Sequence, residues 1–484
     1  MDVRVVQRYE AHLPADDDHP YRTGAWRPNL VEYDATDLDV LEGALPADLV
    51  GTYLRNTENP LLPAIGRYHP FDGDGMLHAI TFAGGRASYR NRMVRTAGLA
   101  AELAAGAPLW AGIIEPAARS TRDGWGARGR LKDASSTDVI VHAGQALTSF
   151  YQCGELYAQD PVTLAPHGAL PWSGGFGGFG VSAHPKLDEV TGELLVFGYG
   201  TTAPYFELGV LDRGGALVHQ QPVPLPGPRL PHDIAFTEHF AIIPDFPLFW
   251  DPALLAQGGH RPRWYPQLPT RFGVVPRTGG EPRWFTAAPT FVLHFINAYE
   301  DGDTIVLDGF HQQDPQPRPD RADGPWAGLK KMVDLGAMGA RPHRWRLDLA
   351  TGRCTEERLF DDVCEFPSIH GRRGGRRHRL AYAMTAKPGW FLFDGLVRLD
   401  LDSGVVQRFR WPDGVYGSEA PVAPRVGATA ENDAYLVTFV SDTVRDTSEC
   451  QVFDARHVDA GPICRVRLPE RIASGTHACW MPGA

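Results

Sequence analysis

Four histidines, spread from the first half of the chain to its end, constrain the fold of this sequence more than any other feature. They are His184, His232, His294 and His477. Each lies in a strand-like or turn-like segment, where a buried imidazole needs partners for both ring nitrogens, and a metal ion can satisfy several imidazoles at once. Because no helix or single hairpin could gather residues so far apart, we expect a closed or strongly curved architecture.

Strand signals dominate the sequence, and long helical periodicity is scarce. Short runs rich in β-branched and aromatic residues are bounded by Gly, Asp and Pro; they cover residues 194–199, 240–243, 304–307 and 435–440. A turn of the form Asp-x-x-x-Gly recurs at residues 188–192, 348–352 and 400–404. Since Asp can cap such a turn and Gly tolerates positive φ, each is predicted to be a tight hairpin. The sequence therefore predicts an all-β fold.

Many short strands with repeated hairpins are typical of a β-sandwich or a β-propeller. A propeller explains the histidines better, because the inner strand of each blade can direct a side chain toward a common axis. No long or low-complexity linker divides the 484 residues, so we predict a single domain over residues 1–484. Residues 312–323, rich in Pro, Asp and Arg, are expected to form an exposed excursion.

Charge and cysteine usage narrow the functional classes. The formal net charge is −11 and no phosphate-tracking motif is present, so nucleic acid is not an expected partner. The charged N-terminal residues lack the apolar core of a signal peptide, which predicts a cytoplasmic protein. Six cysteines are dispersed without a C-x-x-C pair, which argues against both a disulfide framework and a cysteine metal site.

One segment bears on membrane contact. No uninterrupted apolar stretch reaches the roughly 18 residues that a membrane-spanning helix needs. The nearest candidate runs from Leu99 to Ile114; it favours helix and is mostly apolar, but it carries Glu102 and Pro108. Two interpretations stay open, a core or lid helix packed on the body of the protein and a peripheral contact with a membrane surface.

Several short motifs occur together in the order found in one known family. They are Gly51–Asn56, Phe71–Met76, Ala183–Lys186, His232–Asp233, His294–Ala298, Glu365–Pro367, Ser418–Pro421 and His477–Trp480. Over nearly the whole chain the sequence resembles the carotenoid cleavage oxygenases. The resemblance implies a seven-bladed β-propeller with a helical and loop dome over its top face. It also implies a ferrous iron on the axis, held by His184, His232, His294 and His477.

The residues alone do not name the metal, because imidazole suits zinc, copper, iron and nickel alike. On spacing alone a zinc hydrolase also stays open, although such enzymes more typically use three protein ligands and a water. The resemblance implies Fe²⁺, with O₂ as cosubstrate. Four neutral imidazoles would leave an octahedral ion two open positions for O₂ or water.

Metal-bound histidines normally donate their other ring N–H to a carboxylate or carbonyl. The resemblance assigns this role to Glu365, in Glu-Phe-Pro, and to Glu419, in Ser-Glu-Ala-Pro. At the third place many relatives have Trp-Glu-Gly-Gly, and this chain has Tyr-Gln-Cys-Gly, so that Gln152 stands in for a glutamate. An amide oxygen can accept the proton but brings no charge. The alternative is that Glu155 takes the role.

The resemblance implies oxidative cleavage of a conjugated C=C bond to two carbonyl products. Relatives that cleave stilbenes tend to place a lysine where this chain has Tyr151, which favours a carotenoid or apocarotenoid as the apolar substrate. Two alternatives are kept: a stilbene or other phenylpropanoid substrate, and a non-cleaving isomerase or lipid-binding member. We expect a monomer. Candidate walls of the substrate tunnel are Tyr53, Phe71, Trp172, Phe236 and Phe310.

Overall fold

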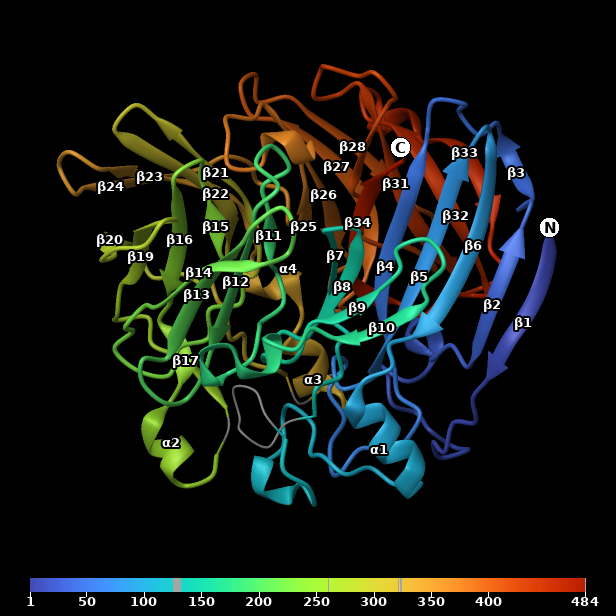
Figure 1. The fold of residues 1–484 in the computed structure, drawn as a ribbon, viewed down its shortest axis with the longest axis horizontal. Helices are drawn as coiled ribbons and strands as arrows, with labels where there is room; N and C mark the ends of the chain where they lie inside the picture. The colour runs from blue at the N-terminus through green and yellow to red at the C-terminus, as the bar shows by residue number, and fades with distance from the viewer. Residues whose placement is uncertain (125–131, 260, 321, 323, 484) are drawn as a thin grey trace.

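The computed structural model describes residues 1–484 except 125–131, 260, 321, 323 and 484. The described part of the chain is mostly β-strand with few helices, which agrees with the predicted fold class at that level (Figure 1). Helices α1, α2 and α3 lie at one end of the sheets in Figure 1. The α-helices are α1 (Ala97–Ala105), α2 (Pro252–Ala256), α3 (Ala327–Lys331) and α4 (Leu335–Met338).

The strands of the first two-thirds of the chain form antiparallel sheets that follow one another in sequence. The first sheet has the order β1 (Asp2–Arg8), β2 (Val31–Thr36), β6 (Arg86–Met93), β5 (Asp74–Ala83), β4 (Gly51–Asn59), β34 (Gly475–Pro482). The second is β10 (Pro166–Ala169), β9 (Tyr157–Gln159), β8 (Gln145–Ser149), β7 (Asp138–His142). The third is β11 (Lys186–Leu187), β12 (Leu194–Tyr199), β13 (Phe206–Leu211), β14 (Leu217–Pro222).

The later sheets continue this pattern. The fourth is β15 (Ala235–Phe236), β16 (Phe240–Asp245), β19 (Thr270–Pro276), β20 (Arg283–Ala287), beside a ribbon of β17 (Leu248–Trp250) and β18 (Pro262–Trp264). The fifth is β21 (Phe295–Asp301), β22 (Thr304–His311), β23 (Arg341–Asp348), β24 (Cys354–Arg358). The last sheet contains β25 (Cys364–Ser368), β26 (Leu380–Ala386), β27 (Phe393–Asp400), β28 (Val406–Arg410), β29 (Val415–Gly417), β30 (Val422–Pro424), β31 (Ala434–Asp442), β32 (Thr447–Asp454), β33 (Pro462–Arg467) and β3 (Val40–Gly43).

Strand pairing joins the N-terminal and C-terminal parts of the chain. The C-terminal strand β34 pairs with β4, so that Trp480 lies opposite Tyr53. Strand β3, from the N-terminal part of the chain, pairs with β33 in the last sheet. Because each end completes a sheet built mainly from the other end, the first and last sheets are held side by side.

Strands from different sheets meet around a cavity of about 270 Å³, here called the inner-strand cavity. Residues of its lining come from β7, β11, β15, β21, β25, β30 and β34. These strands are separated by long stretches of sequence, so their convergence brings distant residues to one place.

The predicted strands and turns are confirmed. All four predicted runs lie within strands, namely β12, β16, β22 and β31. In each predicted turn the glycine N–H donates to the carbonyl of the Asp four residues earlier, at 2.7 to 2.8 Å. Each of these glycines has a φ between +71° and +79°. An Asp carboxylate and a glycine therefore build these hairpins as expected.

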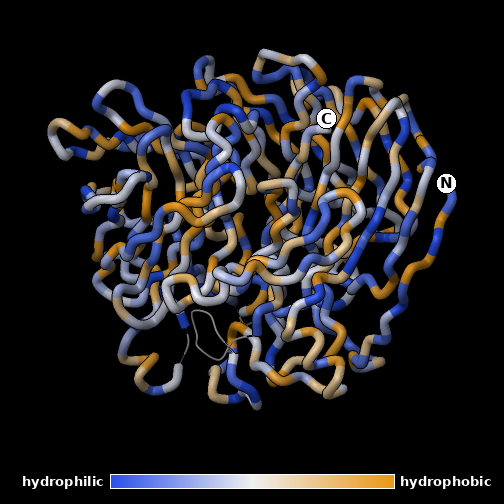
Figure 2. The backbone as a smooth tube through the Cα atoms, viewed as in Figure 1, coloured by the Kyte–Doolittle hydropathy of each residue, from blue (hydrophilic) through white to orange (hydrophobic). Residues whose placement is uncertain are grey.

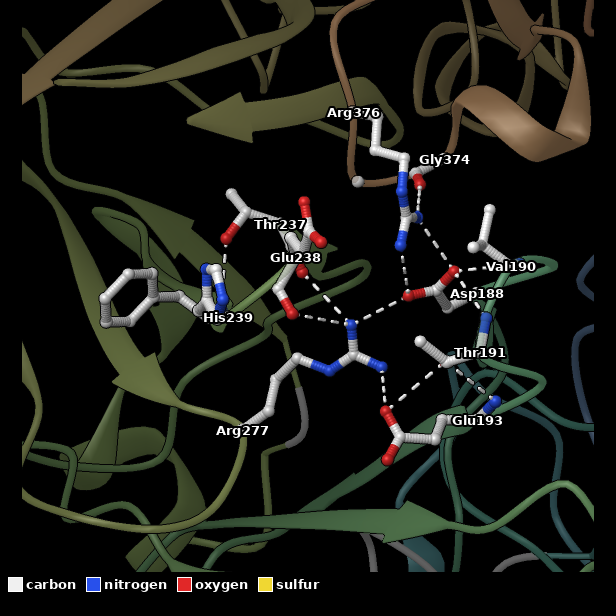
Figure 3. A network of polar contacts seen from close by, with 12 residues as sticks. Asp188, Val190, Thr191, Glu193, Thr237, Glu238, His239, Arg277, Gly374 and Arg376 are labelled. Carbon is white, nitrogen blue, oxygen red and sulfur yellow. Dashed lines mark hydrogen bonds and ion pairs between the residues drawn. The ribbon is translucent and has the colours of Figure 1, made fainter. Parts of the chain in front are cut away.

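One of these turns also anchors a buried polar network between sheets (Figure 3). Asp188 is fully buried and accepts hydrogen bonds from Arg277 at 3.0 Å and from Arg376 at 2.8 Å. Arg277 follows β19 and Arg376 precedes β26, so one carboxylate joins segments of three sheets. Arg277 also ion-pairs with Glu193 at the start of β12.

The segment from Leu99 to Ile114 is only partly helical. Helix α1 begins after Thr96, whose hydroxyl accepts the N–H of Leu99 at 3.0 Å, and ends at Gly106 with φ +63°. Residues 107–114 are not helical, because Gly106 ends the helix in the left-handed conformation and Pro108 follows. Contact of this segment with a membrane stays a proposal.

Hydrophobic and hydrophilic residues alternate in short stretches along the tube in Figure 2. Within the described residues, every helix is too short or too polar to traverse a bilayer. The six cysteines are all free, and four of them are buried.

Replacing the buried turn carboxylate is expected to destabilise the fold strongly. We expect Asp188→Ala to lower the free energy of unfolding by about 3 kcal/mol, because it leaves two guanidinium groups without their buried partner. The matched control is Asp348→Ala, in the same type of turn but without buried arginines; it should destabilise the fold much less, because it loses only two turn hydrogen bonds. Denaturant unfolding measures both variants, and equal losses would contradict the role given to the network.

Candidate metal centre and apolar cavity

Each predicted histidine lies at or near the start of a strand that borders the inner-strand cavity. His184 precedes β11 by two residues, His232 precedes β15 by three, and His294 immediately precedes β21. His477 lies within β34. Because these strands converge, they bring the four imidazoles together from distant parts of the sequence.

The four rings form one compact, buried cluster. The ring centroid of His184 lies 4.8 Å from that of His232, 4.9 Å from that of His294 and 4.6 Å from that of His477. Ligand nitrogens of His184, His294 and His477 all lie within 4.8 Å of one another, which defines a three-histidine site able to hold a metal ion. The Nε2 atoms of His184 and His232 are 3.2 Å apart, close to the roughly 3 Å separating neighbouring ligands around an ion with 2.0–2.1 Å metal–nitrogen bonds. His232 as a fourth ligand stays a prediction.

Two of the predicted carboxylates contact the histidines. Glu365 Oε2 lies 2.6 Å from His294 Nδ1. Glu419 lies 3.3 Å from His477 Nδ1 and also accepts the backbone N–H of Ala478. These contacts fit the orienting role that a carboxylate plays behind a metal-bound imidazole.

A third carboxylate, not found from the sequence, lies against His184. Asp138 Oδ2 is 3.4 Å from His184 Nδ1 and accepts the His184 backbone N–H at 3.0 Å. Asp138 is the first residue of β7, and it lies far from His184 and β11 in the sequence. No local motif marks this residue, because its role depends only on the packing of two sheets.

Gln152 is buried and lines the same cavity as His232, His294 and His477. Its amide group donates to the hydroxyl of Tyr151 at 3.2 Å, and its Oε1 has no partner among the described protein atoms. Glu155 instead accepts a hydrogen bond from Tyr157 at 2.7 Å. That Gln152 orients a histidine stays a prediction.

The protonation of the cluster suits metal binding. Burial lowers the pKa of His184 and His294 well below the ordinary value, and the nearby His477 lowers both further. Burial likewise lowers the pKa of His232 to about 3. For His477, burial also acts to lower the pKa, but the carboxylates of Glu419, Asp138 and Asp233 together outweigh it and the pKa is raised. Three of the rings are thus held in the neutral form that binds metal.

The donor set fits a metal ion. The Nδ1 atom of His294 is engaged with Glu365, and its buried Nε2 has no hydrogen-bond partner among the described residues. A buried ring nitrogen without a protein partner is costly, and an ion bound by the cluster would satisfy it.

Two residues at the cluster have strained backbones. His184 has φ +66° and Phe366 has φ +56°, both in the left-handed region that side chains other than Gly rarely adopt. The Phe366 ring stacks on His477 with centroids 4.4 Å apart and touches His294 edge-on at 4.9 Å. Such strain is often concentrated at functional sites.

An apolar cavity of about 840 Å³, here called the substrate cavity, reaches this cluster. Its lining includes His232, His294 and His477. The size is typical of a small-molecule site. Its wall near the helices is largely hydrophobic and consists of Trp326, Leu329, Met332, Val333, Leu335 and Met338.

Most of the aromatic residues predicted to form the cavity wall lie elsewhere in the structure. Of the five aromatic candidates, only Phe71 lines the substrate cavity in the described structure. Tyr53 and Phe310 instead pack in hydrophobic clusters between strands, because aromatic side chains are also the main filling between sheets. Residues 321 and 323 of the Pro-rich excursion lie outside the described residues; its described residues are mostly exposed, but Gln312 and Pro315 are buried and line the cavity.

Buried histidines on the wall of an apolar cavity define a candidate metalloenzyme site for an apolar small molecule. A model of the family described as RPE65, retinal pigment epithelial membrane protein, matches residues 26–482. The chain belongs to this family of carotenoid cleavage oxygenases, which includes carotenoid cleavage dioxygenases and lignostilbene dioxygenases.

Individual relatives act on different substrates. Carotenoid 9,10(9',10')-cleavage dioxygenase 1 of Pisum sativum is 28% identical over 505 residues, which cover 97% of this chain and 90% of the relative. Isoeugenol monooxygenase of Pseudomonas nitroreducens is 29% identical over 482 residues, which cover 96% and 98%. The solved structure of a lignostilbene dioxygenase of Pseudomonas brassicacearum has a TM-score of 0.83 at 29% identity, and covers 96% of this chain and 99% of its own. The chain is therefore an alkene-cleaving oxygenase of this family with a three-histidine site, and these names leave its substrate class open.

Removing the charge behind His294 is expected to weaken metal binding. We expect Glu365→Gln to raise the metal dissociation constant about tenfold, because a neutral amide orients the imidazole but makes it a poorer donor. Anaerobic titration of metal-free protein with Fe²⁺, followed by elemental analysis, measures this. The control is Glu155→Gln, which should bind metal like the native protein; weaker binding by the control would revive Glu155 as an orienting residue.

Proposed function

We propose that the protein is a non-haem iron(II) dioxygenase that cleaves a conjugated C=C bond of a carotenoid or apocarotenoid to two carbonyl products. The observation that carries this proposal is the placement of His232, His294 and His477 in the wall of a large, mainly apolar cavity. O₂ is the cosubstrate, and each carbonyl product retains one of its oxygen atoms. No nicotinamide or flavin is required, because the alkene supplies the electrons.

Iron(II) would be held by His184, His232, His294 and His477, where it would supply O₂ activation beside the alkene. Glu365, Glu419 and Asp138 hold three of the rings in orientation through their Nδ1 atoms. Gln152 is assigned to the same outer layer, with an amide in place of a carboxylate. Phe366 packs on two of the rings and limits their movement.

The substrate cavity would select the reacting bond by position. Hydrophobic side chains hold an extended polyene along the cavity and exclude water, so that one double bond lies at the histidines. The lining also contains a few polar side chains near the cluster. Thr476 directly precedes His477, Thr137 directly precedes Asp138, and Gln152 carries an amide.

The architecture that best supports this site is a seven-bladed β-propeller with a helical and loop dome. The support is the inner-strand cavity, to which β7, β11, β15, β21, β25, β30 and β34 each contribute. Five of these strands belong to five different antiparallel sheets, and β25 and β30 lie in different parts of the ten-stranded last sheet, as inner strands of separate blades would. We further propose that this propeller is one domain, acts as a monomer in the cytoplasm, and touches a membrane at most peripherally through the 99–114 segment.

A stilbene or other phenylpropanoid is the second candidate substrate, favoured by the similarity to isoeugenol monooxygenase. Against it, the described lining of the substrate cavity contains Tyr151 and no lysine to hold a phenol oxygen. The polyene is therefore the preferred substrate class.

Product analysis decides between the candidates. Iron-loaded protein is incubated with a panel of carotenoids and apocarotenals and, separately, with resveratrol and isoeugenol. We expect O₂ uptake and two carbonyl products, identified by mass spectrometry, with the polyenes. The variant His294→Ala should lose both bound iron and O₂ uptake while remaining folded.

Cleavage confined to the phenols would replace the polyene with the second candidate. An absence of O₂ uptake with every alkene, together with isomerised or unchanged bound lipid, would instead identify a non-cleaving member of the family.

A further inference from the structure

The four histidines adjoin two cavities that share no lining residue in the described part of the chain. One is the substrate cavity. The other, the inner-strand cavity, is lined by residues that follow the histidines on the same segments: Lys186, Ile234, Phe295 and Ala478. These residues are one or two positions beyond a histidine, which is at most about 7 Å along an extended strand. The inner-strand cavity therefore lies close to the cluster, although none of the four histidines is among its lining residues.

The substrate cavity is a poor path for a metal ion. Apart from histidines, the charged residues in the described part of its lining are Arg22, Arg67 and Arg261. No carboxylate is among these lining residues. Most of the remaining wall is hydrophobic. Arg22 and Arg67 are ion-paired, with Asp17 and Glu115. A divalent cation would still lose its water in these surroundings, and no carboxylate of the described lining would replace that water, which is strongly unfavourable.

The inner-strand cavity also has a mostly hydrophobic lining, but its charged groups differ from those of the substrate cavity. Glu189 is exposed and lines it, and Lys186 lines it with a side chain that is 24% exposed. The Lys186 ammonium lies 2.7 Å from Asp233 Oδ1, and Asp233 is fully buried. Asp233 directly follows His232, and its Oδ2 accepts the backbone N–H of Phe295, the residue after His294. Carboxyl groups thus lie both at the solvent-exposed part of this cavity and beside the ligands.

The polar network of Figure 3 holds part of the wall of this cavity in place. Glu189 follows Asp188, and Gly374, which lines the cavity, accepts a hydrogen bond from Arg376 at 3.0 Å. The basic run after β25, residues 372–379, does not leave this region strongly positive, because four of its five arginines are ion-paired. The pairs are Arg373–Glu431, Arg376–Asp188, Arg377–Asp402 and Arg379–Asp400.

We propose that the ferrous ion reaches and leaves the histidines through the inner-strand cavity, and that the Lys186–Asp233 ion pair closes the inner end of this route. This inference rests on the metal site of the proposed function. A hydrated cation is attracted by Glu189, displaces the Lys186 ammonium from Asp233, and exchanges its waters for imidazoles. No covalent bond is made or broken. The metal and the apolar substrate then use separate paths.

Metal exchange in variants with a filled cavity tests the route. In Ile369→Trp a larger side chain fills the inner-strand cavity, whose lining includes Ile369. We expect the release of iron from the loaded protein to excess chelator, and its anaerobic uptake by the stripped protein, to slow about tenfold, as a higher barrier requires. Both rates are followed by elemental analysis of protein separated from free metal at successive times.

Two tryptophan variants serve as controls for this experiment. Leu329→Trp fills the substrate cavity, and Ile463→Trp adds the same side chain on β33, outside the described lining of both cavities. Both should exchange metal at the native rate. Native exchange by Ile369→Trp, or slow exchange by Leu329→Trp, would overturn the proposed route.

Opening the ion pair should have the opposite effect. We expect Lys186→Met to accelerate uptake and release about tenfold, because it removes the cation that competes with the metal for Asp233. Lys331→Met breaks a comparable ion pair, with Asp334, on α3 and should leave both rates unchanged. Unchanged rates in Lys186→Met would remove the ion pair from the route. A native protein that binds no metal at all would refute the metal site itself, which distinguishes that failure from failure of the route.

Discussion

The burial of several imidazoles at one point is the constraint on which the rest of this structure depends. Each buried ring has two requirements. One nitrogen needs a partner at the centre of the cluster, and the other nitrogen needs a hydrogen-bond acceptor behind the ring. His294 and His477 meet the second requirement with Glu365 and Glu419, and His184 lies against Asp138. Because each acceptor comes from a segment distant in sequence from its histidine, the sheets must pack in one arrangement for the cluster to exist.

The polar and apolar parts of the centre are kept apart. Hydrophobic walls approach the histidines on the substrate side, and Lys186, Asp233 and Glu189 lie on the side of the inner-strand cavity. This division suits a reaction between O₂ and an apolar alkene at a metal ion. The hydrophobic wall would exclude water from a bound alkene, and the Lys186–Asp233 pair neutralises a buried charge beside the histidines.

Sequence patterns predicted the repetitive parts of the fold well. The Asp-x-x-x-Gly turns and the β-branched runs depend on nearby residues, and they form the hairpins and strands expected. Helix α1 ends earlier than its composition indicated, because Gly106 adopts the left-handed conformation. The cavity walls were predicted least well. Phe71 lines the cavity and Phe310 is packed between strands, and nothing in their local sequence distinguishes the two.

The sequence by itself determined the strand-rich character, the turns, the family and the histidines worth considering, since these depend on local conformational preference and on recognisable motifs. Tertiary structure alone decided that Asp138 lies behind His184, that Asp233 holds Lys186, and that a carboxylate lines the inner-strand cavity and none lines the described part of the substrate cavity. Those contacts join segments distant in the chain. Their existence depends on how sheets pack and on which side chains fill the space between them, and no short stretch of sequence encodes either.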